Sequence, residues 1–381
     1  MVLATLAAAS LLIWIYILIG RGFFWTTSRP NTPAGSPTPG KRVVAVIPAR
    51  NEAAVIRASL ASLFEQDYGW ILQVIVVDDA STDDTGPIVS AMANEPGLLD
   101  RLTLLPGKPL EAGWTGKLWA LSQGVERALT FNPDYILLTD ADIRHGGDSV
   151  RTLVSIAETR QCDLTSFMVK LACRSVPEKA LIPAFVFFFF QLYPPAWISS
   201  KRFKTAGAAG GCILIKPTAL AKFGGLPAIR DAVIDDCALA RAVKRTGGRL
   251  WLGLTAGSHS LRGYTSFGEI GNMISRTAFN QLRHSSWLLI ATSMGLIVTY
   301  LVPVLAISTS NGLSRSLGAV AWLVMTLCFL PTVKFYRLSP LWALVLPGTA
   351  LFYLVATIRS AILYWRGRGG QWKDRAQDVR A

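Results

Sequence analysis

The sequence predicts an α/β domain built on a parallel sheet and held to a membrane by apolar segments at both ends of the chain. Three near-continuous apolar runs, at 43–47, 72–77 and 135–139, alternate with helical patterns. Such runs are typical of parallel strands covered on both faces, and strands that alternate with helices imply βαβ units. Both ends of the chain also carry apolar stretches long enough to cross a bilayer.

The composition indicates a membrane protein with room for one catalytic domain. Of 381 residues, 51% are hydrophobic and 16% are charged, which is too apolar for an ordinary soluble protein. The formal net charge of +14 fits retention beside an anionic cytoplasmic leaflet. Nucleic-acid binding is disfavoured because no compact Lys/Arg run with interleaved aromatic residues occurs. The five cysteines form no CxxC pair and no zinc-ligand spacing, which fits a reducing compartment.

The N-terminal segment 1–22 is predicted to be a retained transmembrane anchor. An uncharged apolar run fills residues 2–20, and Arg21 follows at once. A cleaved signal peptide is the alternative, but it would need a basic region, and none precedes Val2. The N-terminus is therefore expected outside and Arg21 inside. Residues 23–40 are rich in Pro, Gly, Ser and Thr, so they are predicted to be a linker.

The domain that follows, at 41–286, begins with alternating strands and helices and shows no internal repeat. The helical pattern at 53–64 carries its apolar residues on a single stripe. In the next predicted helix, Asp84 stands three residues after a candidate Ser81 cap. In chain order the predicted elements are strand 43–47, helix 53–64, strand 72–77, a helix that starts at Ser81, strand 102–105, helix 117–130 and strand 135–139.

Paired acids follow two of the predicted strands. Asp78 and Asp79 end the run at 72–77, and Asp140 and Asp142 follow the run at 135–139. Ligands of open α/β sheets bind at the carboxyl ends of the strands. The spacing Asp140-x-Asp142 puts two hard oxygen ligands on one turn, which suits a Mg²⁺ or Mn²⁺ ion that holds a diphosphate. This pattern favours a sugar nucleotide as the ligand.

Glycine-rich phosphate loops are missing from the sequence. Neither GxGxxG after the first strand nor GxxxxGK[ST] occurs, which weighs against a dinucleotide oxidoreductase and a P-loop ATPase. The stretch 113–117 is glycine-rich and enters a helix, so it could place Lys117 near a phosphate. A plain turn and helix start explains the same stretch equally well.

A second apolar stretch, at about 180–204, is predicted to lie in the bilayer interface, as is the segment 259–286. The first contains four consecutive phenylalanines at 187–190 but also three prolines, which argue against a straight span. Three basic residues that follow it could meet lipid headgroups. A buried core helix is the alternative. The basic residues are Lys201, Arg202 and Lys204.

The C-terminal region 287–364 holds three more candidate spans, at 287–308, 317–333 and 341–358. With the N-terminal anchor they would make four crossings and return the tail to the outside. The tail at 365–381 is basic, however, and the positive-inside rule places such a tail in the cytoplasm. The topology therefore stays open, and one candidate that is re-entrant or does not cross would resolve the conflict.

Three motifs taken in order resemble the family 2 glycosyltransferases with a GT-A fold. They are the stretches at 46–52, 77–83 and 140–142, and the likeness covers about 41–286. The terminal spans, the Phe-rich insert and the stretch 276–285 look most like the hopanoid-associated membrane glycosyltransferases of bacteria. The GT-A fold is a Rossmann-like domain that binds nucleoside-diphosphate sugars.

The resemblance implies roles for individual residues. Asp79 would contact the nucleobase with Asp78 in support, and Asp236 would be the general base beside Asp235. The nucleotide site would also include Pro48, Arg50, Glu52 and Asp140. A divalent metal, Mg or Mn, would be held by Asp140 and Asp142. The acceptor or diphosphate side would include Gly210, Gly211, Arg276, Gln281 and Arg283.

Each of these groups has a structural alternative. Asp140 could cap the end of its strand, and Asp235 and Asp236 precede a helical run and could cap that helix. Arg276 and Arg283 could be interfacial arginines that snorkel toward water. Agreement among the separate motifs favours the functional reading of the acids.

The expected function is that of a multi-pass inner-membrane glycosyltransferase with a cytoplasmic catalytic domain. It would move a sugar, with inversion, from a nucleoside-diphosphate donor (a UDP-sugar is favoured) to a lipid hydroxyl, with hopanoid as the implied acceptor. A non-catalytic membrane scaffold of a lipid pathway is the alternative from another class. A polysaccharide synthase is disfavoured because Gln281-Leu282-Arg283-His284 departs from the Gln-x-x-Arg-Trp pattern of polymer-forming members.

Overall fold

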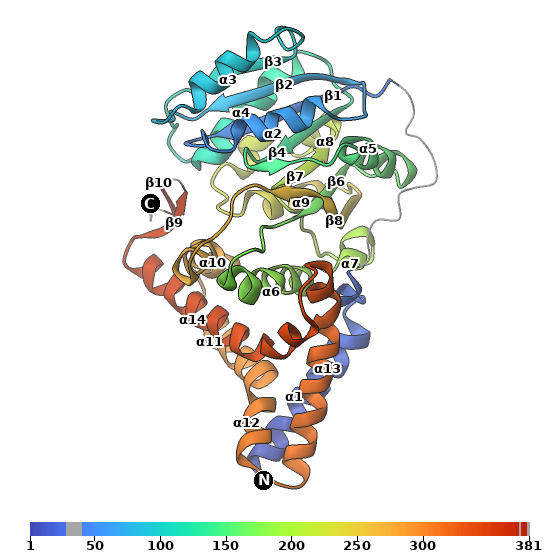
Figure 1. The fold of residues 1–381 in the computed structure, drawn as a ribbon, viewed down its shortest axis with the longest axis vertical. Coiled ribbons are helices and arrows are strands. Elements are labelled where there is room, and N and C mark those ends of the chain that lie inside the picture. The colour runs from blue at the N-terminus through green and yellow to red at the C-terminus, as the bar shows by residue number, and fades with distance from the viewer. Residues whose placement is uncertain (28–39, 373–374, 379–381) are drawn as a thin grey trace.

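A sheet domain stands on a layer of crosswise helices, which in turn stands on a stalk of apolar helices (Figure 1). The computed structural model describes residues 1–27, 40–372 and 375–378. Most of the predicted linker and part of the predicted basic tail lie outside the described residues. The N-terminus lies at the foot of the stalk, and the last described residues lie near the level of the sheet domain (Figure 1).

The sheet has eight strands in the order β3-β2-β1-β4-β7-β6-β8-β5. The four strands on one side of it are parallel, as the alternation of strands and helices predicts. Beyond β4 the sheet is mixed, because β7 is antiparallel to both of its neighbours, and β6 and β8 run parallel. The bounds are β1 Val43–Ala49, β2 Ile71–Asp78, β3 Leu102–Pro106, β4 Tyr135–Thr139, β5 Ile143–Arg144, β6 Leu164–Lys170, β7 Cys212–Ile215 and β8 Leu250–Ser260.

Helices cover both faces of the sheet, and the first strand shows why its sequence is apolar throughout. Val43, Ala45 and Ile47 enter one buried cluster, whereas Val44 and Val46 enter the other. Successive side chains of a strand point to opposite faces, so a strand covered on both sides needs an unbroken apolar run. The helices of the domain are α2 Ile56–Phe64, α3 Thr85–Ala93, α4 Gly116–Leu129, α5 Ser149–Thr159, α8 Pro217–Lys222 and α9 Asp235–Arg245.

The helix expected to start at Ser81 starts later, at Thr85. The reason is a set of side-chain contacts between two loops. Ser81 Oγ accepts a hydrogen bond from Asn51 N–H at 3.0 Å, and Asp83 accepts one from Ala53 N–H at 3.0 Å. These oxygens are used to join the loop after β2 to the loop after β1, so Ser81 does not cap a helix.

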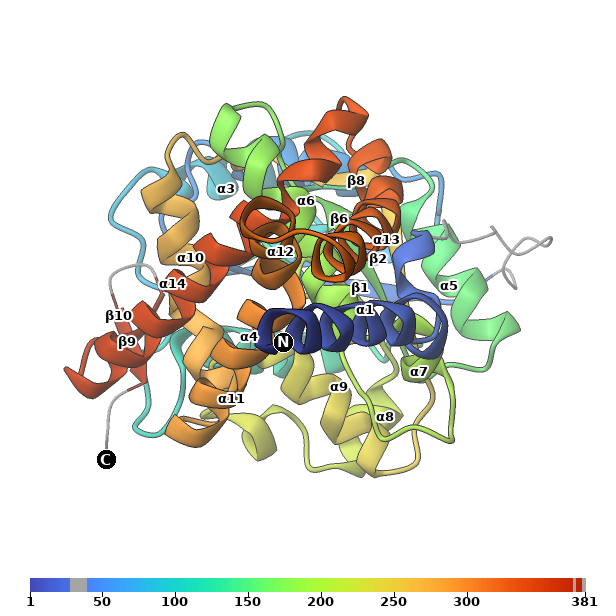
Figure 2. The ribbon, with the colours of Figure 1, turned by 90° about the horizontal axis from the view of Figure 1, so that it is seen from below.

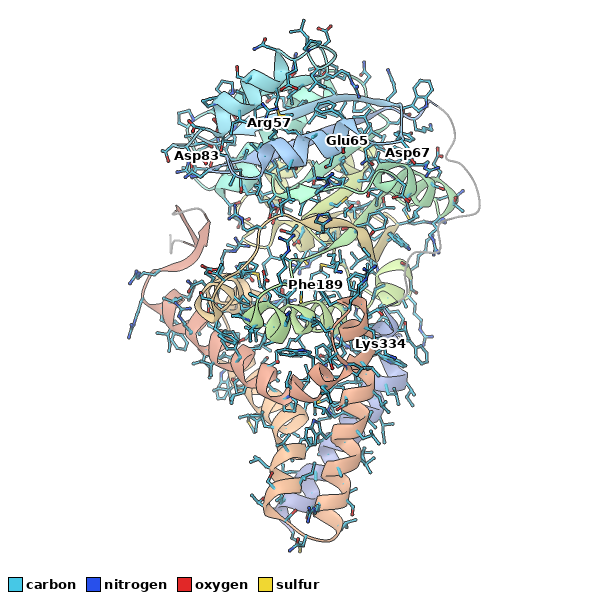
Figure 3. All side chains as sticks on the ribbon, in the orientation of Figure 1. Arg57, Glu65, Asp67, Asp83, Phe189 and Lys334 are labelled. Atoms are coloured by element: carbon cyan, nitrogen blue, oxygen red, sulfur yellow. The ribbon has the colours of Figure 1, made fainter. Side chains whose placement is uncertain are left out.

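The Phe-rich segment forms a crosswise helix, α6 (Val176–Leu192), followed by the short α7 (Pro195–Ser199). Ser175 and Glu178 form a capping box at the start of α6, and Pro183 lies inside the helix without ending it. Figure 1 shows α6 running across the molecule between the sheet domain and the stalk. The side chain labelled Phe189 lies at this level in Figure 3. An interfacial position of α6 in a membrane stays a prediction.

The stalk and its neighbours contain the remaining helices. The helix α13 extends beyond the predicted span at 317–333 at both ends, and Pro331 lies inside it without ending it. Among the described residues, five segments are long and apolar enough to cross a membrane by length and composition: Val2–Gly20, Val176–Ser199, Ser286–Thr309, Leu313–Phe335 and Pro340–Trp365. The helices are α1 Val2–Gly20, α10 Phe267–Gln281, α11 Ser286–Leu296, η3 Ile297–Leu301, α12 Val302–Thr309, α13 Leu313–Phe335, η4 Pro340–Val345 and α14 Leu346–Trp365.

The last long helix, α14, does not run along the stalk. Seen from below, α1, α12 and α13 gather near the centre, while α14 extends sideways beneath α10 (Figure 2). Thr349 near its start donates to the Ala180 carbonyl of α6 at 3.0 Å, and Ser360 near its end donates to the Ser275 carbonyl of α10. Both ends of α14 are therefore tied to helices that lie next to the sheet domain.

Candidate active site

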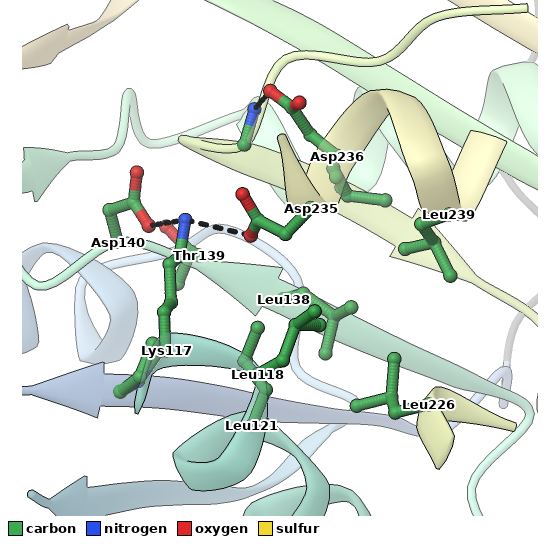
Figure 4. A pocket seen from close by; sticks show the side chains of 13 residues that line it. Lys117, Leu118, Leu121, Leu138, Thr139, Asp140, Leu226, Asp235, Asp236 and Leu239 are labelled. Atoms are coloured by element: carbon green, nitrogen blue, oxygen red, sulfur yellow. Dashed lines mark hydrogen bonds and ion pairs between the residues drawn. The ribbon is translucent and has the colours of Figure 1, made fainter. Parts of the chain in front are cut away.

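The strands bring the predicted acidic clusters to one edge of the sheet. In the β1–β2 register Ala49 pairs with Asp78, and β4 lies on the other side of β1 in the same direction. The carboxyl ends of the three strands are thus neighbours. The start of α9, which carries Asp235 and Asp236, reaches the same edge from a distant part of the chain (Figure 4).

Lys117 joins two of these clusters. Its Nζ lies 2.8 Å from Asp140 Oδ1 and 3.1 Å from Asp235 Oδ2, as Figure 4 shows. Burial on its own would favour the neutral amine, but the two carboxylates outweigh it and hold the pKa of Lys117 above its ordinary value. The lysine stays charged in a site that gathers negative charge.

Asp236 has the geometry of a buried base. Its Oδ2 accepts a hydrogen bond from Gly210 N–H at 2.8 Å, and its Oδ1 accepts one from Cys237 N–H at 2.6 Å. Burial and the neighbouring Asp235 carboxylate raise the pKa of Asp236 to about 6, although Lys117 opposes this shift. A carboxylate with that pKa is mostly ionised at neutral pH and accepts a proton more readily than an ordinary aspartate.

Asp142 is held by a residue at the end of β8, since Ser260 Oγ donates to its Oδ2 at 2.8 Å. Burial, and then repulsion from Asp140, raise the pKa of Asp142 above its ordinary value. A divalent cation between Asp140 and Asp142 would relieve that repulsion, and carboxylate oxygens are the ligands that Mg²⁺ and Mn²⁺ prefer. Within residues 1–27, 40–372 and 375–378 no cluster of three or more metal-ligating side chains occurs. A cation held by these two acids would have to take its remaining ligands from outside the pair, such as a diphosphate and water.

The predicted nucleotide side is built from the loops after β1 and β2. Arg50 donates to the Asp79 carbonyl, and its Nη1 lies 3.9 Å from Asp79 Oδ2. Asp79 is only 2% exposed, so its carboxylate lies beneath the surface of these loops. Asp78 Oδ1 accepts a hydrogen bond from Ser81 N–H at 3.0 Å, which fixes the turn beyond the strand.

Glu52 is held by an arginine from far along the chain. Its carboxylate forms an ion pair with Arg262, which follows β8. Sequence reasoning missed Arg262 and also Ser260, the partner of Asp142. Nothing in the local sequence marks either residue, because the apolar run before them ends at Leu254.

A cavity of about 410 Å³ connects the acids to an apolar wall. Its polar part includes Asp140, Asp142, Asp235, Asp236 and the two arginines Arg262 and Arg276. Its apolar part includes side chains from β6, α6 and α10. Those apolar residues are Met168, Phe185, Phe189 and Met273. One continuous space therefore meets both a charged centre and the Phe-rich helix.

The two predicted glycines, Gly210 and Gly211, line this cavity. A Cβ on Gly210 would come within 3.3 Å of both Asp236 Oδ2 and Lys117 Nζ. The Gly211 carbonyl accepts a hydrogen bond from Thr139 Oγ1 at 2.8 Å, which joins the loop to the end of β4. A side chain at Gly210 would crowd the acid and the lysine, which come close together at this point.

Two predicted acceptor-side residues are placed differently. Gln281 is hydrogen-bonded through its side chain to Tyr193 OH, so it ties α10 to the end of α6. Arg283 follows the end of α10 with a φ of 53°, in the turn toward α11. Neither residue lines the 410 Å³ cavity, whereas Arg276, on the same helix, does. The structure thus brings Arg276 to the acids but not Gln281 or Arg283.

Comparison with known proteins agrees with this architecture. Residues 44–223 match the family described as "Glycosyl transferase family 2". Among curated proteins, the "Probable glycosyltransferase YdaM" of Bacillus subtilis (strain 168) is 30% identical over 209 residues, which is 54% of this chain and 46% of that protein. The chain therefore spans about half the length of this curated relative.

A solved structure shows the likeness of the fold. The mannosyltransferase PcManGT from Pyrobaculum calidifontis, in complex with GDP-Man and Mn²⁺, superposes with a TM-score of 0.55 at 18% identity and covers 93% of this chain and 99% of its own. The fold is mixed α/β and GT-A-like, as expected from the sequence. The family match at 44–223 takes in strands β1 to β7 of the sheet.

Proposed function

We propose that this protein is a membrane-bound, inverting glycosyltransferase that moves a sugar from a nucleoside-diphosphate donor to a hydroxyl group of a membrane lipid. One observation carries the proposal: a single cavity joins the carboxylates at the sheet edge to Phe185 and Phe189 of the crosswise helix α6. A soluble acceptor would need no such apolar wall. A scaffold without activity would need no buried acid with a pKa raised to about 6, such as Asp236.

In the proposed reaction Asp236 takes the proton of the acceptor hydroxyl as its oxygen attacks the anomeric carbon from the face opposite the leaving group. The nucleoside diphosphate leaves with negative charge, and Lys117 is placed beside Asp140 to meet that charge. A divalent cation bound at Asp140 and Asp142 would neutralise part of the same charge. Arg50, Asp78 and Asp79 shape the side proposed for the nucleotide, for which a UDP-sugar is favoured.

The likeness to PcManGT, which was solved with GDP-Man and Mn²⁺, supports the donor class and the metal, although it leaves the sugar and the base of the donor open. Hopanoid is the acceptor that we propose. The terminal apolar helices and the Phe-rich helix α6 support a lipid acceptor of this kind, and a glycerolipid or ceramide-like lipid is the nearest alternative.

We also propose an inner-membrane location with the sheet domain in the cytoplasm. In this arrangement α1, the α11–α12 segment and α13 cross the bilayer, whereas α14 stays on the cytoplasmic side with α10. The ties of α14 to α6 and α10 support this topology. It resolves the conflict between four spans and a basic tail, because three crossings and an external N-terminus leave the C-terminus inside.

The test is transfer by the purified full-length chain in detergent or vesicles. Radiolabelled nucleotide sugars with different bases are supplied with Mn²⁺ or Mg²⁺ and a hydroxylated lipid extract, and the label is followed into the lipid phase. We expect metal-dependent transfer from one donor class. Absence of transfer and of donor hydrolysis with every nucleotide sugar, together with absence of metal-dependent nucleotide binding, would favour the scaffold. Long water-soluble products would instead indicate a polysaccharide synthase.

A further inference from the structure

A basic surface lies where the end of α1 meets α7, beside the junction of the stalk and the sheet domain (Figures 1 and 2). It consists of Arg21, Lys201, Arg202 and Lys204, none of which takes part in the proposed sugar transfer. The three residues from the loop after α7 are exposed. Across the described segments of the chain, no carboxylate forms an ion pair with any of the four.

Two of these cations stand at the ends of one aromatic stack. The guanidinium carbon of Arg21 lies 4.7 Å from the ring centroid of Trp197, and that of Arg202 lies 6.0 Å from the centroid of Phe203. The two rings stack on each other at 4.6 Å with an interplanar angle of 8°. Arg21 Nε also donates to the Gln191 carbonyl at 2.8 Å. Stacking on a ring orients a guanidinium and leaves the N–H donors at its edge open to an anion.

The loop that carries the other cations is fixed by a single ammonium group from α9. Lys244 Nζ lies within hydrogen-bonding distance of four backbone carbonyl oxygens, at 2.7 to 3.1 Å. These carbonyls belong to Trp197, Ile198, Ser200 and Thr205. The loop is thus ordered before any ligand arrives, which lowers the entropic cost of binding.

We propose that this basic surface binds the phosphate headgroups of anionic phospholipids. Its place in the fold supports a lipid source, because Arg21 comes directly after the 19-residue apolar helix α1. A helix of that length spans the hydrocarbon core, so the residue after it lies at the depth of the headgroups. Arginine binds phosphate oxygens through paired N–H donors, and lysines nearby add attraction to an anionic leaflet.

The test uses the full-length protein in neutral detergent, without nucleotide, so its outcome does not depend on sugar transfer. Native mass spectrometry counts bound phosphatidylglycerol, with phosphatidylcholine as the neutral lipid and inorganic phosphate as a free anion. The variant is Lys201→Gln/Arg202→Gln/Lys204→Gln. The matched control, Arg101→Gln/Lys108→Gln/Arg127→Gln, removes the same charge from exposed residues of the β3–α4 region, far from the stalk.

We expect the parent and the control to prefer phosphatidylglycerol over phosphatidylcholine, and the loop variant to lose about tenfold or more of that preference. Lys244→Met should reduce the preference with all four basic residues still present, because it frees the loop. A circular dichroism spectrum and a thermal melt equal to those of the parent show that the variants are folded. An equal preference in the loop variant and the control would overturn the proposal, as would displacement of the lipid by millimolar inorganic phosphate.

Discussion

Replacement of Asp236 by asparagine tests the proposed chemistry most directly. The two side chains have nearly the same shape, and the single oxygen of asparagine can keep the hydrogen bond from Gly210 N–H but not also the one from Cys237 N–H. The variant cannot take a proton from the acceptor hydroxyl. A general base contributes about 10² to 10⁴ in rate, so kcat should fall by that factor. The corresponding rise in the activation free energy is about 3 to 5 kcal/mol.

The assay measures initial rates of label transfer into lipid and, separately, the affinity for the nucleotide. Affinity should stay within about threefold of the parent value, because the variant changes the acceptor step and not the nucleotide loops. Asp231→Asn is the matched control, since it makes the same chemical change at an exposed residue shortly before α9. Turnover of Asp236→Asn at the rate of the control would refute the assignment of Asp236 as the base.

Three further results are expected. Replacement of Asp140 or Asp142 by alanine should weaken metal-dependent nucleotide binding about tenfold or more, because each replacement removes a hard oxygen ligand. Titration calorimetry with and without Mn²⁺ measures this affinity. An unchanged affinity would rule out the metal assignment. Burial and Asp235 raise the pKa of Asp236 to about 6. The value of kcat/KM should therefore be flat above pH 6 and fall about tenfold per pH unit below it, because the base becomes protonated. A profile that stays flat down to pH 4.5 would contradict this. Phe189→Ala should raise the KM for the lipid about tenfold and leave donor hydrolysis unchanged. The reason is that full burial of a phenylalanine side chain contributes about 1.5 to 3 kcal/mol. An unchanged KM would mean that the lipid does not contact α6.

The first half of the sheet domain could be predicted because its signals are local. The strand at 135–139 has the predicted bounds, and β1, β2 and β3 extend their predicted runs by only one or two residues. β1 and β4 are buried along their whole length and therefore need an unbroken apolar run, whereas the edge strand β3 is only half-buried over most of its length. The paired acids after β2 and β4 could be found for the same reason, since they come directly after those runs.

The prediction that a helix starts at Ser81 was wrong, because the Ser81 side chain has a partner in another loop. A serine followed three residues later by an acid fits a capping box, but Ser81 Oγ is taken by Asn51 N–H, thirty residues earlier in the chain. Local propensity gave a reasonable expectation, and a contact between two loops overrode it.

By itself, the sequence determined that this protein has an α/β domain with acids at its strand ends and apolar helices at both termini. Burial and periodicity act between near neighbours in the chain, so these features leave a local trace. Only the tertiary structure decided that Ser260 holds Asp142, that Lys117 joins Asp140 to Asp235, and that α14 turns back toward the sheet domain. Those contacts join residues as far as 169 positions apart, as in the hydrogen bond from Thr349 to Ala180, and a contact of that range depends on how the whole chain packs.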